Sequence, residues 1–185
     1  MFTQDKYIDI LEYAAFAHGE QKTPKNFPYL VHITSVAMEV INACEKSNLE
    51  IEKSDFAISC ALLHDIIEDT DITYDDLYVK FGYEIADGIE ALTKDKALKT
   101  KQEQMKDSIE KLLAQPYEVQ MVKLADRITN LSTPPKHWNN EKIKEYLKEA
   151  KFILSCLKNS NIYLSQRLEE KIENYKKFIK EWISK

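Results

Sequence analysis

The chain has 185 residues, of which 44% are hydrophobic and 31% are charged. This length suits one domain, and the hydrophobic fraction is enough to form a buried core without disulfides. The formal net charge is −5, with acidic and basic residues interspersed. Such a balance argues against broad adhesion to a nucleic-acid polymer or an anionic membrane, and it leaves room for a small anionic substrate where basic residues gather locally.

The cysteines and the first residues indicate a cytoplasmic protein. Cys44, Cys60 and Cys156 are odd in number and far apart, so we expect neither a disulfide framework nor a cysteine metal site. The opening MFTQDKYIDILEY mixes acids into its apolar positions, which a signal peptide does not, and no apolar run approaches membrane-spanning length. We therefore expect neither export nor membrane insertion.

Only three glycines and five prolines punctuate the chain, which favours long helices over a sheet with many turns. Apolar spacing predicts a first helix over residues 4–18, ended by Gly19. The polar segment 20–27 is expected to be a loop. Pro28 suits the first turn of a second helix that runs to about Cys44. The prediction is an all-α fold, with residues 1–185 forming a single domain.

The third predicted helix belongs at the centre of the fold. Ser54 is a suitable cap, and the run FAISCALL over residues 56–63 is apolar nearly all round. A helix of this kind seldom carries charge. This one nevertheless ends in HDIIED, residues 64–69, where most side chains are ionisable.

The second half of the chain continues the helical pattern. Helices are predicted over residues 74–81, 83–92, 102–114, 118–131 and 141–157, with a basic loop over 93–101. A last helix falls within 160–185. Its apolar stripe, at three- and four-residue steps, consists of Leu164, Leu168, Ile172, Tyr175, Ile179 and Trp182. We favour packing of this stripe inside the domain and keep a homo-oligomer through it as the alternative.

Residues 64–69 suggest a site. Residues four apart share one face of a helix, so His64 is predicted to lie over Glu68 and Asp65 over Asp69. Burying these charges beside an apolar helix is costly unless a metal or a partner compensates them. The alternative is a helix end that emerges into solvent and continues as an acidic loop.

Two distant residues strengthen the first interpretation. His32 lies on an apolar helix, where a lone histidine is more often an ordinary core residue. Asp126 lies near the apolar face of its helix, where an ion pair with Lys123 is the plainer explanation. With His64 and Asp65 they offer two imidazoles and two carboxylates from three helices, a set suited to Mn²⁺, Fe²⁺ or Zn²⁺.

These residues resemble the HD superfamily of metal-dependent phosphohydrolases. More specifically, they resemble the hydrolase domain of the RelA/SpoT alarmone enzymes and its small stand-alone, metazoan-SpoT-homologue type. The matching segments are HGEQ (18–21), PYLVH (28–32), ALLHDIIEDT (61–70), FG (81–82), LTKDK (92–96), KLADRITN (123–130), Trp138 and EYLKEA (145–150). The likeness runs from about residue 5 to 157. It implies an HD-domain bundle of roughly eight to ten helices, with 160–185 as a C-terminal packing helix.

The resemblance also implies a reaction, the hydrolysis of the 3′-pyrophosphate of guanosine tetra- or pentaphosphate, (p)ppGpp. Mn²⁺ would be held by His32, His64, Asp65 and Asp126. Glu68 and Asp69 match the acid pair of the family and are placed to orient or deprotonate a water. Which of the two is the base stays open.

Candidate substrate contacts follow from the same likeness. Asn130 and Tyr146 match positions near the bound nucleotide, although packing of Tyr146 against the bundle is an equally good explanation. Lysines can receive phosphates as point charges, yet most surface lysines are only solvated. The candidates are Lys22, Lys25, Lys94, Lys96 and Lys101.

The chain departs from the family in one loop. Alarmone hydrolases typically carry Arg-Lys after the HxxQ segment, and that arginine stacks on guanine. Here residues 22–26 read KTPKN and contain no arginine. Lysine cannot stack as a planar guanidinium does. Guanine selectivity is therefore in question, whereas the metal chemistry is not.

Three functions remain open at this stage. The first is an alarmone hydrolase, and the second is an HD phosphohydrolase for another nucleotide, such as a phosphatase acting on NADPH. The third is a catalytically silent nucleotide-binding or regulatory domain. Every expected ligand and both acids are present. Their presence favours an enzyme.

Overall fold

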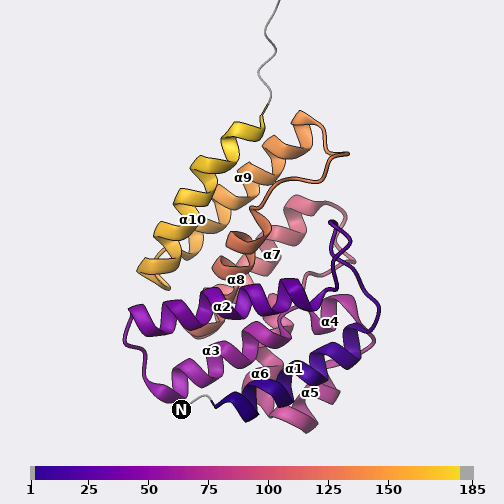
Figure 1. The fold of residues 1–185 in the computed structure, drawn as a ribbon, viewed down its shortest axis with the longest axis vertical. Helices are drawn as coiled ribbons and strands as arrows, with labels where there is room; N and C mark the ends of the chain where they lie inside the picture. Colours follow the sequence, from indigo (N-terminus) through magenta and orange to yellow (C-terminus); the bar gives the residue numbers. More distant parts are fainter. Residues whose placement is uncertain (1–2, 180–185) are drawn as a thin grey trace, which may run out of the picture.

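The computed structural model describes residues 3–179, and within this range the chain is helical (Figure 1). The helices are α1 (Gln4–His18), α2 (Leu30–Lys46), α3 (Ile51–Leu63), α4 (Ile66–Asp69), α5 (Tyr74–Phe81), α6 (Tyr83–Leu92), α7 (Lys101–Leu113), α8 (Tyr117–Asn130), α9 (Asn140–Leu157) and α10 (Ile162–Tyr175). A 3₁₀ turn, η1 (Lys176–Phe178), follows α10. The all-α prediction and the expected number of helices are confirmed.

Most helix ends follow local sequence signals. Thr3 caps α1 by accepting a bond from the Lys6 amide, and Gly19 ends this helix with φ at 49°. Such a positive φ is natural for glycine. Thr73 caps α5 and Thr100 caps α7, each in a reciprocal capping box with the acid three residues on.

Two helix starts differ from the prediction. Helix α3 begins at Ile51, so Ser54 is not its cap and instead donates to the carbonyl of Leu49 at 3.3 Å. A serine inside the first turn can bond back to the chain in this way, so it marks a helix start only to within a turn. Helix α2 begins at Leu30, and Pro28 precedes its first turn.

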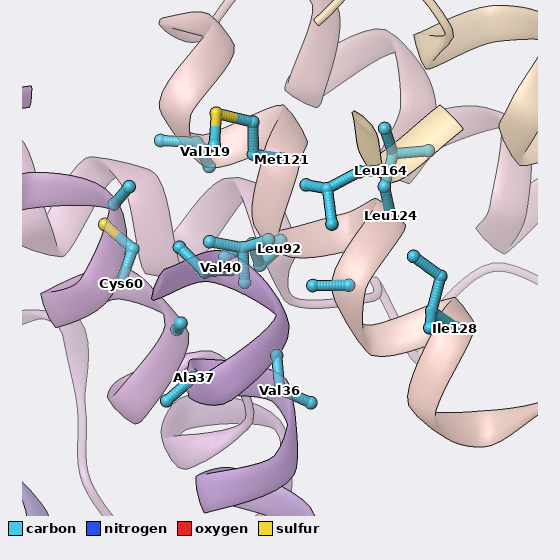
Figure 2. Packing of buried hydrophobic residues seen from close by; sticks show 14 of the residues in the cluster. Val36, Ala37, Val40, Cys60, Leu92, Val119, Met121, Leu124, Ile128 and Leu164 are labelled. Atoms are coloured by element: carbon cyan, nitrogen blue, oxygen red, sulfur yellow. The ribbon is translucent and has the colours of Figure 1, made fainter. Parts of the chain in front are cut away.

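Helices α2, α3 and α8 pack around the centre of the domain. The second half of α3, from Ala57 to Leu63, is buried throughout. Figure 2 shows apolar side chains of several helices meeting in this core, among them Val40, Cys60 and Leu124. In α6, a Cβ at Gly88 would lie 3.1 Å from the Val119 side chain. The missing side chain therefore lets α6 approach α8 closely.

The apolar stripe of the last helix faces the domain itself. Leu164, Leu168, Ile172 and Tyr175 are buried as α10 packs on α8, α9 and α2 (Figure 1). Trp182, also assigned to this stripe, lies outside the described residues. None of the described helices has the length and hydropathy needed to cross a membrane.

Replacing Leu168 with alanine tests the packing of α10. Leu168 has no exposed surface, so truncation should lower the free energy of unfolding by about 2–5 kcal/mol. Urea unfolding followed by circular dichroism measures this change. The neighbouring exposed Glu169→Ala should change it by less than about 0.5 kcal/mol. If the loss in free energy of unfolding caused by Leu168→Ala varied with protein concentration, it would instead indicate packing between subunits.

Candidate metal centre and substrate cavity

Two histidine rings meet in the interior of the fold. His32, in the first turn of α2, and His64, directly after α3, are both buried, and their Nε2 atoms lie 3.1 Å apart. Nδ1 of His64 lies 2.9 Å from the carbonyl oxygen of Ala61. Because a carbonyl can only accept, Nδ1 carries the proton and Nε2 is the nitrogen presented to the centre. Metal-binding histidines are commonly oriented in this way.

Two carboxylates complete the cluster. Oδ2 of Asp65 lies 2.9 Å from Nε2 of His64 and 3.4 Å from Nε2 of His32. Oδ1 of Asp126, on α8, lies 3.5 Å and 4.0 Å from Nε2 of His32 and His64, respectively. His32, His64 and Asp126 each offer a ligand atom within 4.8 Å of the others. The structure thus brings together all four residues that the sequence nominated.

A break in the helix makes this convergence possible. Helix α3 ends at Leu63, and Asp65 has φ −104° and ψ 2°, so a turn separates α3 from α4. The predicted stacking of His64 over Glu68 in one continuous helix is therefore wrong. Consecutive side chains of an α-helix diverge by about 100°, whereas a turn lets His64 and Asp65 point at one centre.

The electrostatics of the cluster call for positive charge at its centre. Burial opposes the charged form of His64, but the Asp65 carboxylate outweighs it and raises the pKa of His64 to about 9. Burial likewise opposes ionisation of Asp65, yet the two histidines hold the pKa of Asp65 well below its usual range. A cation and a proton would compete for the same nitrogen. Two imidazole nitrogens and two carboxylates fit a divalent transition metal.

Further side chains hold these carboxylates in place. The Tyr29 hydroxyl donates to Oδ2 of Asp65 at 2.6 Å, and burial together with Asp65 raises the pKa of Tyr29, so the phenol keeps its proton. The Asn130 amide donates to Asp126. Nζ of Lys123 lies 3.9 Å from Oδ2 of Asp126, so the ion pair considered from sequence accompanies the histidine contacts. Bonds of this kind fix ligand orientation.

The two acids beyond the cluster have different partners. Glu68 accepts bonds from the backbone nitrogen and Nζ of Lys94, the latter at 3.1 Å, and Lys96 donates to the Glu68 carbonyl at 2.5 Å. Oδ2 of Asp69 accepts a bond from Nε2 of Gln21 at 3.0 Å. Gln21 in turn accepts a bond from Nδ1 of His18 at 2.7 Å. Glu68 is thus paired with a cation, while Asp69 is oriented by a neutral amide.

A cavity of about 640 Å³ opens beside this centre. The 19–29 loop forms one wall and is closed by a bridge between Lys22 and Pro28. The start of α2, the end of α8 and the 131–138 segment form the others. Residues with candidate roles that line it are Gln21, Lys22, Lys25, Tyr29, His32, Asp69, Asn130, Trp138 and Tyr146.

The candidate substrate contacts therefore separate into three groups. Four of them, Lys22, Lys25, Asn130 and Tyr146, line the cavity. Lys94 and Lys96 instead bond to Glu68, as described above. Lys101 begins α7 and lines a different depression, between α7 and α9.

Tyr146 both packs against the bundle and lines the cavity, so its packing leaves the expected nucleotide contact possible and untested. The guanidinium of Arg127 lies 4.3 Å from its ring centroid, and the Trp138 ring meets it edge-on at 5.1 Å. Its ring centroid is 6.2 Å from that of Tyr175 on α10. These contacts hold the Tyr146 ring in place at the edge of the cavity.

Sequence reasoning gave no role to Tyr29 or Gln21. Both occur in segments that carried the family likeness, PYLVH and HGEQ, and that likeness was the only available signal. Their partners, Asp65 and Asp69, lie far along the chain from them. Contacts of this kind depend on the fold.

The arrangement agrees with comparisons to known proteins, in which the HD domain family model matches residues 11–160. The chain belongs to the HD domain family. It is 31% identical to the guanosine-3′,5′-bis(diphosphate) 3′-pyrophosphohydrolase MESH1 of Drosophila melanogaster, over 89% of this chain and 92% of that protein. The enzyme of the same activity name from Aquifex aeolicus is 35% identical over 79% of this chain, which spans 20% of that longer protein.

Solved structures agree with these sequence relatives. A metazoan SpoT orthologue described as hydrolysing ppGpp superposes with a TM-score of 0.79, at 29% identity, covering 94% of this chain and 97% of the other. The protein lmo0812 of Listeria monocytogenes gives a TM-score of 0.58 at 19% identity, which is a likeness of fold alone. The expected HD-type architecture is confirmed.

Removing either histidine should greatly weaken metal binding. His32→Ala and His64→Ala each delete a nitrogen donor, so we expect the affinity for Mn²⁺ to fall by more than about 100-fold, since even supporting residues contribute 10- to 100-fold. Isothermal titration of chelator-treated protein measures the affinity. The exposed His137→Ala is the matched control and should bind as the unaltered chain does. Undiminished binding by both cluster variants would refute the assignment.

Proposed function

We propose that this protein is a metal-dependent hydrolase that removes the 3′-pyrophosphate from ppGpp or pppGpp. The observation that carries the proposal is the cluster of His32, His64, Asp65 and Asp126 beside a cavity that also receives Asp69. The MESH1 relatives, similar over most of their length, are named for this activity. We propose the cytoplasm as the site of action and alarmone turnover as the role.

The metal would be held by the two histidines and the two aspartates of the cluster, and Mn²⁺ is the proposed ion. When bound there, a divalent ion would polarise a phosphoryl oxygen and lower the pKa of a water, which would make a nucleophile available near neutral pH. Tyr29 and Asn130 would orient the carboxylates of Asp65 and Asp126 through the bonds already described.

Of the two acids, we assign Asp69 as the general base. Its carboxylate lines the cavity, and the Gln21 amide that orients it carries no charge. Glu68 is instead paired with the Lys94 ammonium and is not among the residues that line the cavity. Glu68 therefore serves mainly to fasten the segment after α6 to α4, with Lys94 and Lys96 as its partners.

The cavity wall supplies the contacts to the nucleotide. Lys22 and Lys25 are placed to bind phosphate groups, and Asn130 and Tyr146 to contact the nucleoside. The aromatic rings of Phe27, Trp138 and Tyr146 offer stacking surfaces. In this proposal they take over the stacking that arginine provides in related enzymes.

One observation favours a second candidate, an HD phosphatase acting on another nucleotide such as NADPH. No arginine lines the cavity among the described residues. Stacking on aromatic rings accepts any base, because every base has a flat face. The same centre could therefore act on an adenine nucleotide that carries a phosphate on its ribose.

Assays of the purified, Mn²⁺-loaded chain against ppGpp, NADPH and simple nucleotides separate these candidates. We expect pyrophosphate and a guanosine 5′-diphosphate product from ppGpp, with activity lost on chelation and restored by Mn²⁺. Absence of pyrophosphate release from ppGpp, with phosphate release from NADPH, would replace the first function by the second. Binding of either nucleotide without any turnover would indicate a regulatory domain.

The Asp69→Asn variant tests the assignment of the base. The amide keeps the shape of the side chain but cannot take a proton, so kcat should fall by about 10²- to 10⁴-fold. Mn²⁺ affinity should stay unchanged, because Asp69 is not one of the proposed ligands. Glu68→Gln serves as the comparison and should retain more activity. A larger loss in Glu68→Gln than in Asp69→Asn would reverse the two roles.

A further inference from the structure

A second cavity adjoins the substrate cavity on its α10 side. This cavity, called the α10 cavity here, has a volume of about 540 Å³ and lies between α10, η1 and the 131–133 segment. Its wall includes Lys25, Arg167, Lys171 and Lys177, and the one acid among its lining residues is Glu170. None of the functions proposed so far uses the α10 residues.

The charges in this cavity are only partly compensated. Nη2 of Arg167 donates to Oε1 of Glu39 at 2.6 Å, and Nη1 of Arg167 lies 3.7 Å from Oε2 of Glu170. For Lys171 and Lys177, the described part of the chain provides no carboxylate within salt-bridge distance. An excess of positive charge therefore gathers here, on a chain whose net charge is −5.

The two cavities meet at a shared wall. Lys25 and Ser132 line both, and Nζ of Lys25 donates to Oγ of Ser132 at 2.9 Å. Tyr175 of the α10 cavity also contacts Tyr146 of the substrate cavity, with ring centroids 6.2 Å apart. A ligand that extends from the metal centre past Lys25 would therefore enter the α10 cavity.

The chemistry of the wall identifies what such a ligand must present there. Lysine ammonium groups are compact charges with three donors each, and they bind phosphate as point charges. The hydroxyls of Ser132 and Thr133 add short polar contacts. A neutral base would leave the ammonium groups without a counter-charge, whereas a phosphate chain would satisfy them.

We propose that the α10 cavity binds the 5′-phosphate groups of a nucleotide whose 3′-pyrophosphate lies at the metal centre. This inference rests on the proposed function and adds to it a separate subsite, formed by α10, for the 5′ end of the substrate. Lys171 and Lys177 then determine specificity for the 5′ end, and Lys25 bridges the two cavities. A free phosphate ion or a second nucleotide could supply the same chemistry, so the test must separate these sources.

The experiment compares three guanosine 3′-diphosphates that carry a 5′-hydroxyl, a 5′-diphosphate or a 5′-triphosphate. With the intact, Mn²⁺-loaded chain, kcat/KM should be at least about tenfold higher for the 5′-phosphorylated compounds than for the 5′-hydroxyl compound, because their KM is lower. In Lys171→Ala/Lys177→Ala this preference should fall to within about threefold of unity. Lys144→Ala/Lys151→Ala removes the same charge from exposed positions of α9 and should keep the preference. Thermal unfolding checks that both double variants are folded.

Two results would overturn the inference. One is an equal preference in the Lys171→Ala/Lys177→Ala variant and the unaltered chain. The other concerns the rate of hydrolysis of the 5′-hydroxyl compound when inorganic phosphate or guanosine diphosphate is added. If the addition changes this rate in the unaltered chain but not in that variant, the cavity binds a separate effector. If no compound is hydrolysed, the proposed function fails. In that case, calorimetry measures the affinities of the same three compounds. The ratio of affinity for the 5′-phosphorylated compounds to affinity for the 5′-hydroxyl compound, in the unaltered chain and in the variant, then decides the inference.

Discussion

The structure depends on one constraint: ionisable side chains of the cluster must be held inside an apolar helical core. Helix α3 is buried along its second half, and the turn at His64 and Asp65 stops it at the point where polar side chains are needed. His32 from α2 and Asp126 from α8 reach the same point. Each buried charge is compensated by another member of the cluster, so the loss of one would leave its neighbours unpaired.

Much of the fold could be predicted because its signals are local. Gly19 ends α1, and Thr73 and Thr100 carry reciprocal caps, all within a few residues of the boundaries that they set. The break after α3 could not be predicted in this way, because HDII contains neither glycine nor proline. It is held by the tertiary bond from the Tyr29 hydroxyl to Asp65, together with the bond from His64 to the carbonyl of Ala61 at the end of α3. Local propensity does not report such bonds.

The candidate site shows the same difference between local signals, which the sequence carries, and tertiary contacts, which it does not. Charges in apolar helices pointed to His64, Asp65 and Asp126, because the cost of burying them required an explanation. The distinction between Glu68 and Asp69 came only from their partners, Lys94 and Gln21, which are 26 and 48 residues away. Sequence alone could not decide which lysines face the cavity, since a lysine near a site can pair with a neighbouring acid instead.

The metal centre and the walls of the substrate cavity have different structural origins. The four proposed ligands come from core helices and the turn between two of them, whereas much of the wall comes from the 19–29 loop and the 131–138 segment. Loops tolerate replacement better than packed helices do. Evolution can therefore exchange the residues around Lys22 and Phe27, and with them the preferred base, while the catalytic core is inherited intact. Related proteins that share the core need not share a substrate.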